Sequence, residues 1–98
     1  MREEYETPNI LGVKALDNYL IYLKFETNEE KIYDMKKLIN ENKFYNKLKN
    51  KNYFKNVKTR GDSIEWDNGE DIAPENLYYD SININEFKED IEDIKELD

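Results

Sequence analysis

The 98-residue chain contains no cysteine and no histidine. Without cysteine it can form no disulfide, no thiolate metal site and no thiol nucleophile. Without histidine it lacks the commonest metal ligand and the side chain that most often acts as a general base near neutral pH. A Gly-rich phosphate-binding loop is also missing, so no group of residues combines a nucleophile, a base and a stabilising donor. The sequence therefore predicts a protein that is not an enzyme and that holds neither a metal ion nor a cofactor.

Long apolar runs are equally scarce. No stretch approaches the length of a membrane span, and the N-terminal MREEYETPN lacks the apolar core of a signal peptide. We therefore expect a soluble, cytoplasmic protein with no membrane contact. Hydrophobic residues make up only 38% of the chain, but aromatic residues reach 13%, so the small core of a single domain can be built largely from rings.

Charge is distributed unevenly along the chain, although the net charge is −8. Residues 1–35 carry a net charge of −4, residues 36–60 carry +8, and residues 61–98 carry −12. Such segregation predicts either complementary surfaces within one molecule or two faces presented to charged partners.

Alternating hydrophobicity and turn signals predict an α+β fold whose small, mainly antiparallel sheet has about five strands. The strands are expected at 10–16, 19–26, 31–35, 56–60 and 63–67. The second of them should be central, because apolar side chains occupy both of its faces at its start. We expect residues 1–9 to be a flexible tail, 10–82 to be the α+β core domain, and 83–98 to be an acidic amphipathic helix.

Two short helices are predicted between the third and fourth strands. Asp34 fits the N-cap of the first, where its carboxylate can accept unpaired backbone N–H groups. In the second, over 43–54, Phe44 and Leu48 share a face at i, i+4 spacing and should be buried, with Tyr45 as a further candidate. The clearest helix is C-terminal, because Asn83 and Glu86 match a capping box at its start.

The stretch SIEWDNGEDIAPENLYYD, residues 63–80, holds the only tryptophan and clusters Asp67, Glu70 and Asp71. These carboxylates do not match the spacing of a calcium loop, and the tip of a turn is too wet to favour acid–base catalysis. Turn geometry explains them better, with Gly69 supplying a positive φ. We therefore predict structural roles for Trp66, Asn68, Gly69, Asp71, Pro74 and Tyr78.

Hairpin pairing around this stretch can also be predicted. Gly61-Asp62 is a two-residue turn signal that would place Val57 opposite Trp66 and Thr59 opposite Ile64. A strict two-residue turn at Asn68-Gly69 would then place Asp71 opposite Trp66 on the buried face, where a charge is costly. We therefore expect the pairing to stop there, Asp71 to cap the next turn, and Pro74 to open it.

The basic segment 36–60 mixes lysines with aromatic residues, as proteins that bind single-stranded nucleic acid do. The lysines that would contact nucleic acid are Lys43, Lys47, Lys51 and Lys55. The acidic chain and the near absence of arginine argue against this function, and the spacing of the rings favours a role as helix anchors. Nucleic-acid binding is therefore an alternative and not the main prediction.

The acidic outer face of helix 83–97 is the main candidate for contact with a partner, which we expect to be another, basic protein. The residues concerned are Glu89, Asp90, Glu92, Asp93 and Glu96. The apolar stripe of this helix could instead pair with a second copy and form a homodimer, or pack on the core. Its carboxylates could also imitate the phosphates of a nucleic acid.

Several motifs follow one another along the chain. They are V-K-A-x-x-x-Y-x-I-x-L-x-F from Val13, then Asp34, Phe44 and Leu48, then Phe54-x-x-Val57, and last I-x-W-x-N-G-x-D-I-x-P-x-x-L-Y from Ile64 to Tyr78. Together they resemble the bacterial family called domain of unknown function 2442. The resemblance implies an α+β fold around a small antiparallel sheet and no established catalytic activity. Two positions depart from the family pattern: Asn28-Glu29 replace a usual glycine, so that turn could be longer, and Asp67 replaces a frequent proline.

The resemblance also implies a gene neighbourhood like that of toxin–antitoxin pairs. The predicted function is therefore a small, non-catalytic protein-binding module, an antitoxin-like or regulatory member of a bacterial two-gene system or the product of a mobile element. The alternatives are an acidic inhibitor that mimics nucleic acid, as some anti-CRISPR proteins do, and nucleic-acid binding through residues 36–60.

Overall fold

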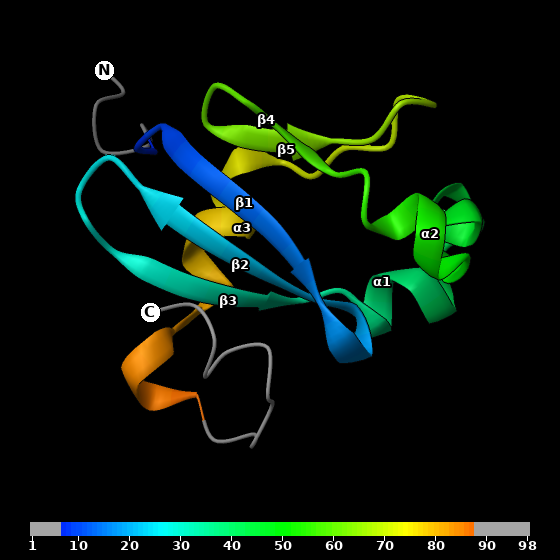
Figure 1. Cartoon of the computed structure of the whole chain (residues 1–98), viewed down its shortest axis with the longest axis horizontal. Coiled ribbons are helices and arrows are strands. Elements are labelled where there is room, and N and C mark those ends of the chain that lie inside the picture. The colour runs from blue at the N-terminus through cyan, green and yellow to red at the C-terminus, as the bar shows by residue number, and fades with distance from the viewer. Residues whose placement is uncertain (1–6, 88–98) are drawn as a thin grey trace.

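Two antiparallel sheets form the framework of the protein in a computed structural model that describes residues 7–87 (Figure 1). The first sheet has the order β1-β2-β3-β6, and the second contains β4 and β5. The strands are β1 (Ile10–Leu16), β2 (Leu20–Phe25), β3 (Glu30–Asp34), β4 (Lys58–Arg60), β5 (Ser63–Glu65) and β6 (Ile82–Asn83). The predicted α+β class and the antiparallel pairing are confirmed. The single sheet of about five strands is wrong, because β4 and β5 form a separate hairpin and a short β6 extends the first sheet.

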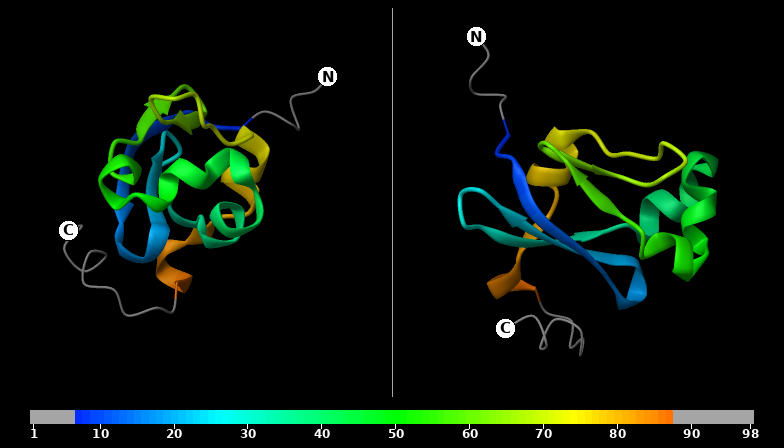
Figure 2. Two further views of the ribbon diagram at one scale, coloured as in Figure 1. Left: turned by 90° about the vertical axis from the view of Figure 1, so that its right-hand side faces the viewer. Right: turned by 45° about the horizontal axis from the view of Figure 1, so that its top comes forward.

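Short helical elements connect the strands. They are α1 (Lys36–Glu41), α2 (Lys51–Phe54), α3 (Pro74–Tyr79) and the 3₁₀ turns η2 (Asp17–Tyr19), η3 (Lys43–Lys49) and η4 (Ile84–Glu86). α1 and α2 lie together at one end of the molecule, whereas α3 lies behind the sheet in the view of Figure 1. Figure 2 shows the same arrangement from two other sides, with η4 well away from α3. No helix among residues 7–87 is long and apolar enough to cross a membrane.

β2 is the central strand of the core, as its sequence predicts. Ile21, Leu23 and Phe25 are fully buried on one face, where the helices and the β4–β5 hairpin cover them. Leu20 is equally buried on the opposite face, in a smaller cluster that includes Ile84 from η4. Both faces of the sheet therefore pack against other parts of the chain.

The helical segment after Asn42 is not one α-helix. Asn42 accepts a hydrogen bond from the Phe44 N–H and begins the 3₁₀ turn η3, and Asn50 accepts bonds from two backbone N–H groups and begins α2. A 3₁₀ turn has three residues per turn, so side chains at i and i+3 share a face. Tyr45 and Leu48 are accordingly buried, whereas Phe44 is 54% exposed. The prediction that Phe44 is buried is wrong for this reason.

Asp34 acts at the start of α1 as expected, with a shift of one residue. Its Oδ1 accepts a hydrogen bond of 2.9 Å from the Lys36 N–H, while the backbone of Met35 stands at the N-cap. Such shifts are normal at helix ends.

Two tight turns share one hydrogen-bond pattern. In the β2–β3 turn the Phe25 N–H donates to Glu29 O and the Asn28 N–H donates to Phe25 O. In the turn after β5, Trp66 N–H donates to Glu70 O and Gly69 N–H to Trp66 O. Both are three-residue loops whose last residue has a positive φ, 76° for Asn28 and 100° for Gly69. Asn28 thus takes in the β2–β3 turn the left-handed conformation that Gly69 takes in the turn after β5.

We expect Gly69→Ala to destabilise the protein by about 1–2 kcal/mol, because a Cβ in the left-handed region is strained even though open space surrounds it. Asn28→Gly should change the free energy of unfolding by less than about 0.5 kcal/mol, since glycine and asparagine both tolerate this conformation. Urea denaturation measures both. Gly12→Ala is the matched control, because Gly12 has no positive φ and its new Cβ would make only ordinary contacts. An equal loss of unfolding free energy in Gly69→Ala and Gly12→Ala would contradict the explanation.

Hydrogen bonds hold the two ends of the described chain. Thr7 Oγ1 donates to Asp62 Oδ2 at 2.8 Å, and Asn9 N–H donates to Glu26 Oε2 at 2.9 Å. At the other end Asn83 accepts a bond from the Asn85 N–H, but the element that it begins is the 3₁₀ turn η4, after which Phe87 is extended. The predicted α-helix therefore does not run through 83–87, and residues 88–98 lie outside the described part of the chain.

Candidate functional site

Trp66 anchors the corner between the β4–β5 hairpin and α2. Its side chain is 1% exposed, and its Nε1–H donates to the Phe54 carbonyl oxygen at 2.9 Å. The Trp66 and Phe54 rings stack with centroids 5.9 Å apart. Because the indole is enclosed and its polar atom is paired, Trp66 offers no surface to a ligand.

A buried carboxyl group lies next to Trp66, and it belongs to Glu70. The three-residue loop shifts the pairing by one residue, so Glu70 and not Asp71 lies opposite Trp66. Glu70 is only 4% exposed. The Tyr53 hydroxyl donates to Glu70 Oε1 at 2.7 Å and accepts the Asn68 N–H at 2.8 Å. Burial and this bond raise the pKa of Tyr53. The Tyr53–Glu70 pair therefore joins α2 to the turn.

Asp71 has a different place from the predicted one. The pairing does not stop before it, because Asp71 forms a bridge with Glu65. Its side chain is half exposed, and its Oδ2 lies 3.7 Å from Arg60 Nη1, while its carbonyl oxygen accepts a hydrogen bond from the Tyr45 hydroxyl at 2.9 Å. Ala73, which has no capping side chain, stands at the N-cap of α3, so Asp71 does not cap this helix. Pro74 occupies the first turn of α3, as expected.

α3 is fixed to the sheet by Tyr78. Its ring packs edge-on against Phe25 at 5.0 Å, and its hydroxyl donates to Glu29 Oε1. The hydrogen bond and burial raise the pKa of Tyr78 to about 12. The same hydrogen bond holds the pKa of Glu29 below its usual value. On the other face of the sheet, burial and a bond to Glu30 raise the pKa of Tyr22 to about 12.

We expect the free energy of unfolding to fall as the pH rises from about 10 toward 12. An unfolded tyrosine loses its proton near the usual pKa of 10.0, whereas folded Tyr22 and Tyr78 keep theirs until about 12. The folded state then binds more protons, so a stabilisation that is complete below pH 10 is lost as the pH passes through the folded pKa values. Urea denaturation at a series of pH values measures the slope.

Tyr78→Phe is the matched variant for this prediction. The bond to Glu29 also contributes stability that is present above the usual glutamate pKa and lost as the pH falls below it, because the folded pKa of Glu29 is lowered. The stability deficit of Tyr78→Phe should therefore be largest near neutral pH and shrink at both extremes. A deficit that is the same at all pH values would show that the hydroxyl acts only through packing.

The polar groups described so far serve to join elements. Within residues 7–87 no group of three or more acidic side chains is arranged to hold a metal ion. The salt bridge of 2.7 Å between Lys58 and Asp67 spans the hairpin on the surface and raises the pKa of Lys58. The polar side chains around Trp66, Asn68 and Gly69 thus have structural roles, because they connect the hairpin, the turn and α2.

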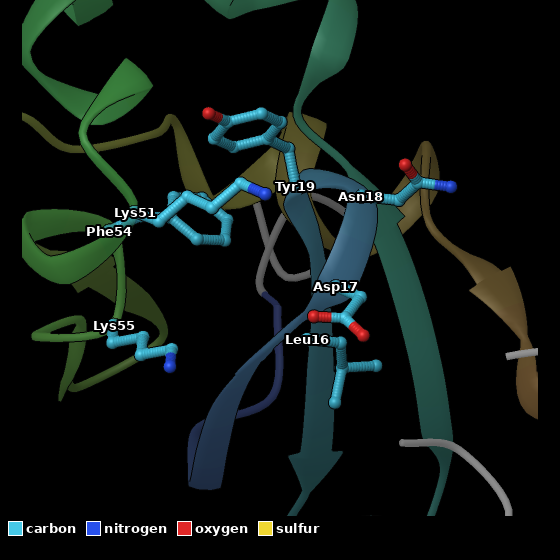
Figure 3. A pocket seen from close by; sticks show the side chains of 7 residues that line it. All are labelled: Leu16, Asp17, Asn18, Tyr19, Lys51, Phe54 and Lys55. Carbon is cyan, nitrogen blue, oxygen red and sulfur yellow. The ribbon is translucent and has the colours of Figure 1, made fainter. Parts of the chain in front are cut away.

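The β1–β2 turn forms a small hollow against α2 (Figure 3). Asn18 and Tyr19 have positive φ values of 65° and 57°, which is uncommon for a tyrosine. The Tyr19 hydroxyl donates to Lys49 O at 2.6 Å, and its ring packs edge-on against Phe54 at 5.2 Å. These contacts hold the turn in place. The hollow has a volume of about 30 Å³, enough for water but not for a substrate.

Six exposed lysines surround the helical end of the molecule, and we call them the lysine layer. They are Lys37, Lys43, Lys47, Lys49, Lys51 and Lys55. Within the described part of the chain none of the six forms an ion pair with a carboxylate. In contrast, residues 61–87 carry eight acidic and no basic residues. The described chain therefore carries its positive and negative charges in separate segments, which the Lys58–Asp67 and Arg60–Asp71 ion pairs join.

The four lysines predicted to contact nucleic acid lie at different places on the surface. Lys51 and Lys55 line the hollow beside the β1–β2 turn, as Figure 3 shows, whereas Lys43 lines a different cleft between α1 and η3. The Lys47 ammonium lies 5.5 Å from the centre of the Tyr53 ring. No single groove holds all four.

Most rings of the segment 36–60 point inward. Tyr45 and Phe54 are buried, and the hydroxyl of half-buried Tyr53 is engaged with Glu70. Phe44 is the exposed ring of this segment, and its neighbour Tyr45 packs edge-on against it at 5.0 Å. One exposed ring provides a poor platform for stacked bases.

The predicted partner-binding residues of the C-terminal helix, which are Glu89, Asp90, Glu92, Asp93 and Glu96, lie outside the described part of the chain. Most of the segment 83–97, whose apolar stripe was the alternative site for a homodimer, also lies outside it. Sequence reasoning also missed the Tyr53–Glu70 pair and the left-handed Tyr19. The one signal for the pair was the Asn-Gly turn, whose loop length decides which acidic residue faces inward.

A family model described as "Protein of unknown function (DUF2442)" matches residues 10–83. This range begins with β1 and ends with β6, and it includes both sheets. No curated protein and no solved structure matches the chain.

Proposed function

The chain belongs to the DUF2442 family, and on that premise we propose that it is a non-catalytic protein-binding module. The observation that carries the proposal is the lysine layer, whose six charges have no carboxylate partner within the described residues. Like charges gathered without partners repel one another, but they attract and orient a surface of opposite charge. The lysine layer therefore favours a partner with an acidic surface.

A protein partner is favoured over a nucleic acid for two reasons. The rings of the segment 36–60 are mostly occupied in the core, so stacking on bases has little support. The chain as a whole has a net charge of −8, and segment 36–60 contains one arginine against eight lysines. Arginine reads phosphates and bases better than lysine does.

The acidic residues Glu89, Asp90, Glu92, Asp93 and Glu96 remain a second proposed contact, for a basic partner. The family resemblance supports an antitoxin-like or regulatory role in a bacterial two-gene system, and the same carboxylates would serve an inhibitor that imitates nucleic acid. These roles share one property, which is binding without chemistry.

Capture of partners from nuclease-treated host lysate by the full chain, with identification by mass spectrometry, is the first test. Affinity for the purified partner is then compared for two variants, one with Lys43, Lys47, Lys51 and Lys55 changed to Glu and one with the five acidic residues changed to Gln or Asn. We expect the lysine variant to lose at least about tenfold in affinity and the parent to bind more weakly at high salt.

Three results would contradict the proposal. A complex that is captured from untreated lysate but not from nuclease-treated lysate would favour nucleic acid. Equal affinity in the parent and the lysine variant would remove the observation that carries the proposal. Substrate turnover that is lost on Asp71→Asn alone would show that the protein is an enzyme.

A further inference from the structure

β1 forms one edge of the first sheet, and the short β6 forms the other. β1 pairs with β2 on one side, and on its other side it approaches the β4–β5 hairpin. One backbone hydrogen bond joins the two within the described residues, from the Ile10 N–H to Gly61 O at 2.9 Å. Beyond this bond the strands diverge toward α2, as Figure 1 shows. A groove of about 400 Å³ lies between them, lined by Val13, Lys14, Ala15, Lys55 and Val57.

The register shows which backbone groups face this groove. Phe25 N–H bonds to Glu29 O and so points toward β3, and successive residues of a strand alternate in direction. Leu23 and Ile21 therefore also point toward β3. Their partners on β1 are Val13 and Ala15, which must direct their N–H and C=O groups away from β2.

Ile10 provides an internal check on this assignment. It pairs with Phe25, so it should also direct its N–H away from β2, and its bond to Gly61 O shows that it does. Within residues 7–87, the backbone donors and acceptors that Val13 and Ala15 present to the groove therefore have no partner. Such an edge is the site at which an extended peptide can add as a further strand.

The side chains around the groove define the kind of peptide that fits. Val13, Ala15 and Val57 are half-buried at the border of the main core, so they provide an apolar floor. Lys14 and Lys55 are exposed and form no ion pair within residues 7–87. Because side chains alternate along a strand, an added strand would place every second residue on each face.

Building on the proposed function, we propose that the β1 edge binds an extended segment of the partner protein in which acidic residues alternate with small apolar residues. The backbone of this segment pairs with Val13 and Ala15. Its apolar side chains pack beside Val57, and its carboxylates lie near Lys14 and Lys55.

A second copy of this chain fits the edge less well. A two-fold pairing that uses both Val13 and Ala15 places Lys14 directly opposite the same residue of the other copy. Like charges in directly opposed positions destabilise a sheet. The charge of the edge therefore favours an acidic segment of a different protein.

The test uses the isotopically labelled full chain and a short synthetic peptide in which Glu and Val alternate. On titration, the amide signals of Val13 and Ala15 should shift and their hydrogen exchange should slow, whereas those of Leu23 and Ile21 should not change. A peptide that alternates Lys and Val should not bind. A peptide that alternates Glu and Pro should not bind either, because proline removes every second backbone N–H donor and does not extend a β-ladder.

Three variants separate strand addition from general charge attraction. Lys14→Glu with Lys55→Glu should weaken peptide binding about tenfold, whereas Lys43→Glu with Lys47→Glu, the matched pair on η3, should not. Ala15→Pro removes a donor that β2 does not use, so it should abolish binding and keep the fold. If Ala15→Pro unfolds the chain, the charge variants still decide.

The proposal is overturned if the peptide shifts only signals of α1 and η3, or if both lysine pairs weaken binding equally. It is also overturned if the Val13 and Ala15 amides are already protected without peptide. Protection that depends on protein concentration would then identify a second copy, and protection that does not would identify another segment of this chain. If the peptide fails but a partner from the lysate still binds through the lysine layer, only this inference fails and the proposed function stands.

Discussion

Replacing Trp66 with alanine is expected to lower the free energy of unfolding by about 3–5 kcal/mol, because the change empties the volume of a fully enclosed aromatic side chain. The loss includes the stacking of Trp66 on Phe54 and the hydrogen bond to the Phe54 carbonyl. Since small domains are stable by about 5–15 kcal/mol, the variant should be close to unfolding at moderate temperature. Circular dichroism during urea denaturation measures the loss, because the variant has no tryptophan fluorescence.

Two controls define the origin of this effect. Trp66→Phe keeps a ring in the site but leaves the Phe54 carbonyl without its donor, so it should cost about 1–3 kcal/mol. Phe44→Ala changes a ring that is 54% exposed and should cost less than about 0.5 kcal/mol. A Trp66→Ala variant with nearly parental stability but no partner binding would instead place Trp66 in an interface.

The central strand could be predicted from the sequence because its signal is local. Ile21, Leu23 and Phe25 alternate with less apolar residues, and a strand has no other way to bury them on one face. The β4–β5 hairpin was predictable for the same reason, since the Gly61-Asp62 turn fixes the pairing of Thr59 with Ile64. Patterns with a period of two residues leave little choice of register.

Helical spacing was less informative. The sequence 43–54 suits an α-helix or a 3₁₀ turn, and the two place different residues inside. Asn42 and Asn50 cap separate elements, and the resulting 3₁₀ turn buries Tyr45 with Leu48 in place of Phe44. The energies of caps and packing decide between such alternatives, and neither is visible in a hydrophobic pattern.

The contacts of the candidate site were also only partly predictable from the sequence. Burial of Trp66 followed from its residue type and position, but the partner of Glu70 did not, because Tyr53 lies 17 residues earlier in the chain. One additional residue in the Asn68-Gly69 loop exchanged Asp71 for Glu70 on the buried face. The open edge of β1 was equally hidden, since it depends on how two separate hairpins diverge.

Tyr53→Phe should lower the free energy of unfolding by about 1.5–3 kcal/mol, although it removes a single oxygen atom. The loss of the hydroxyl leaves the Glu70 carboxyl group without this donor in a site that is 4% exposed, and it leaves the Asn68 N–H without this acceptor. Polar groups that are buried without partners cost more than the hydrogen bond itself contributes. Urea denaturation at neutral pH measures this effect.

A double-mutant cycle with Glu70→Gln tests whether the two side chains act as a pair. Glutamine still accepts the Tyr53 hydroxyl bond and carries no charge into the buried site, so Glu70→Gln alone should be nearly neutral or stabilising. In that background Tyr53→Phe should cost less, with a coupling energy of about 1 kcal/mol. If Tyr53→Phe costs the same in both backgrounds, its hydroxyl supports the Asn68 N–H alone, and Glu70 must be stabilised in another way.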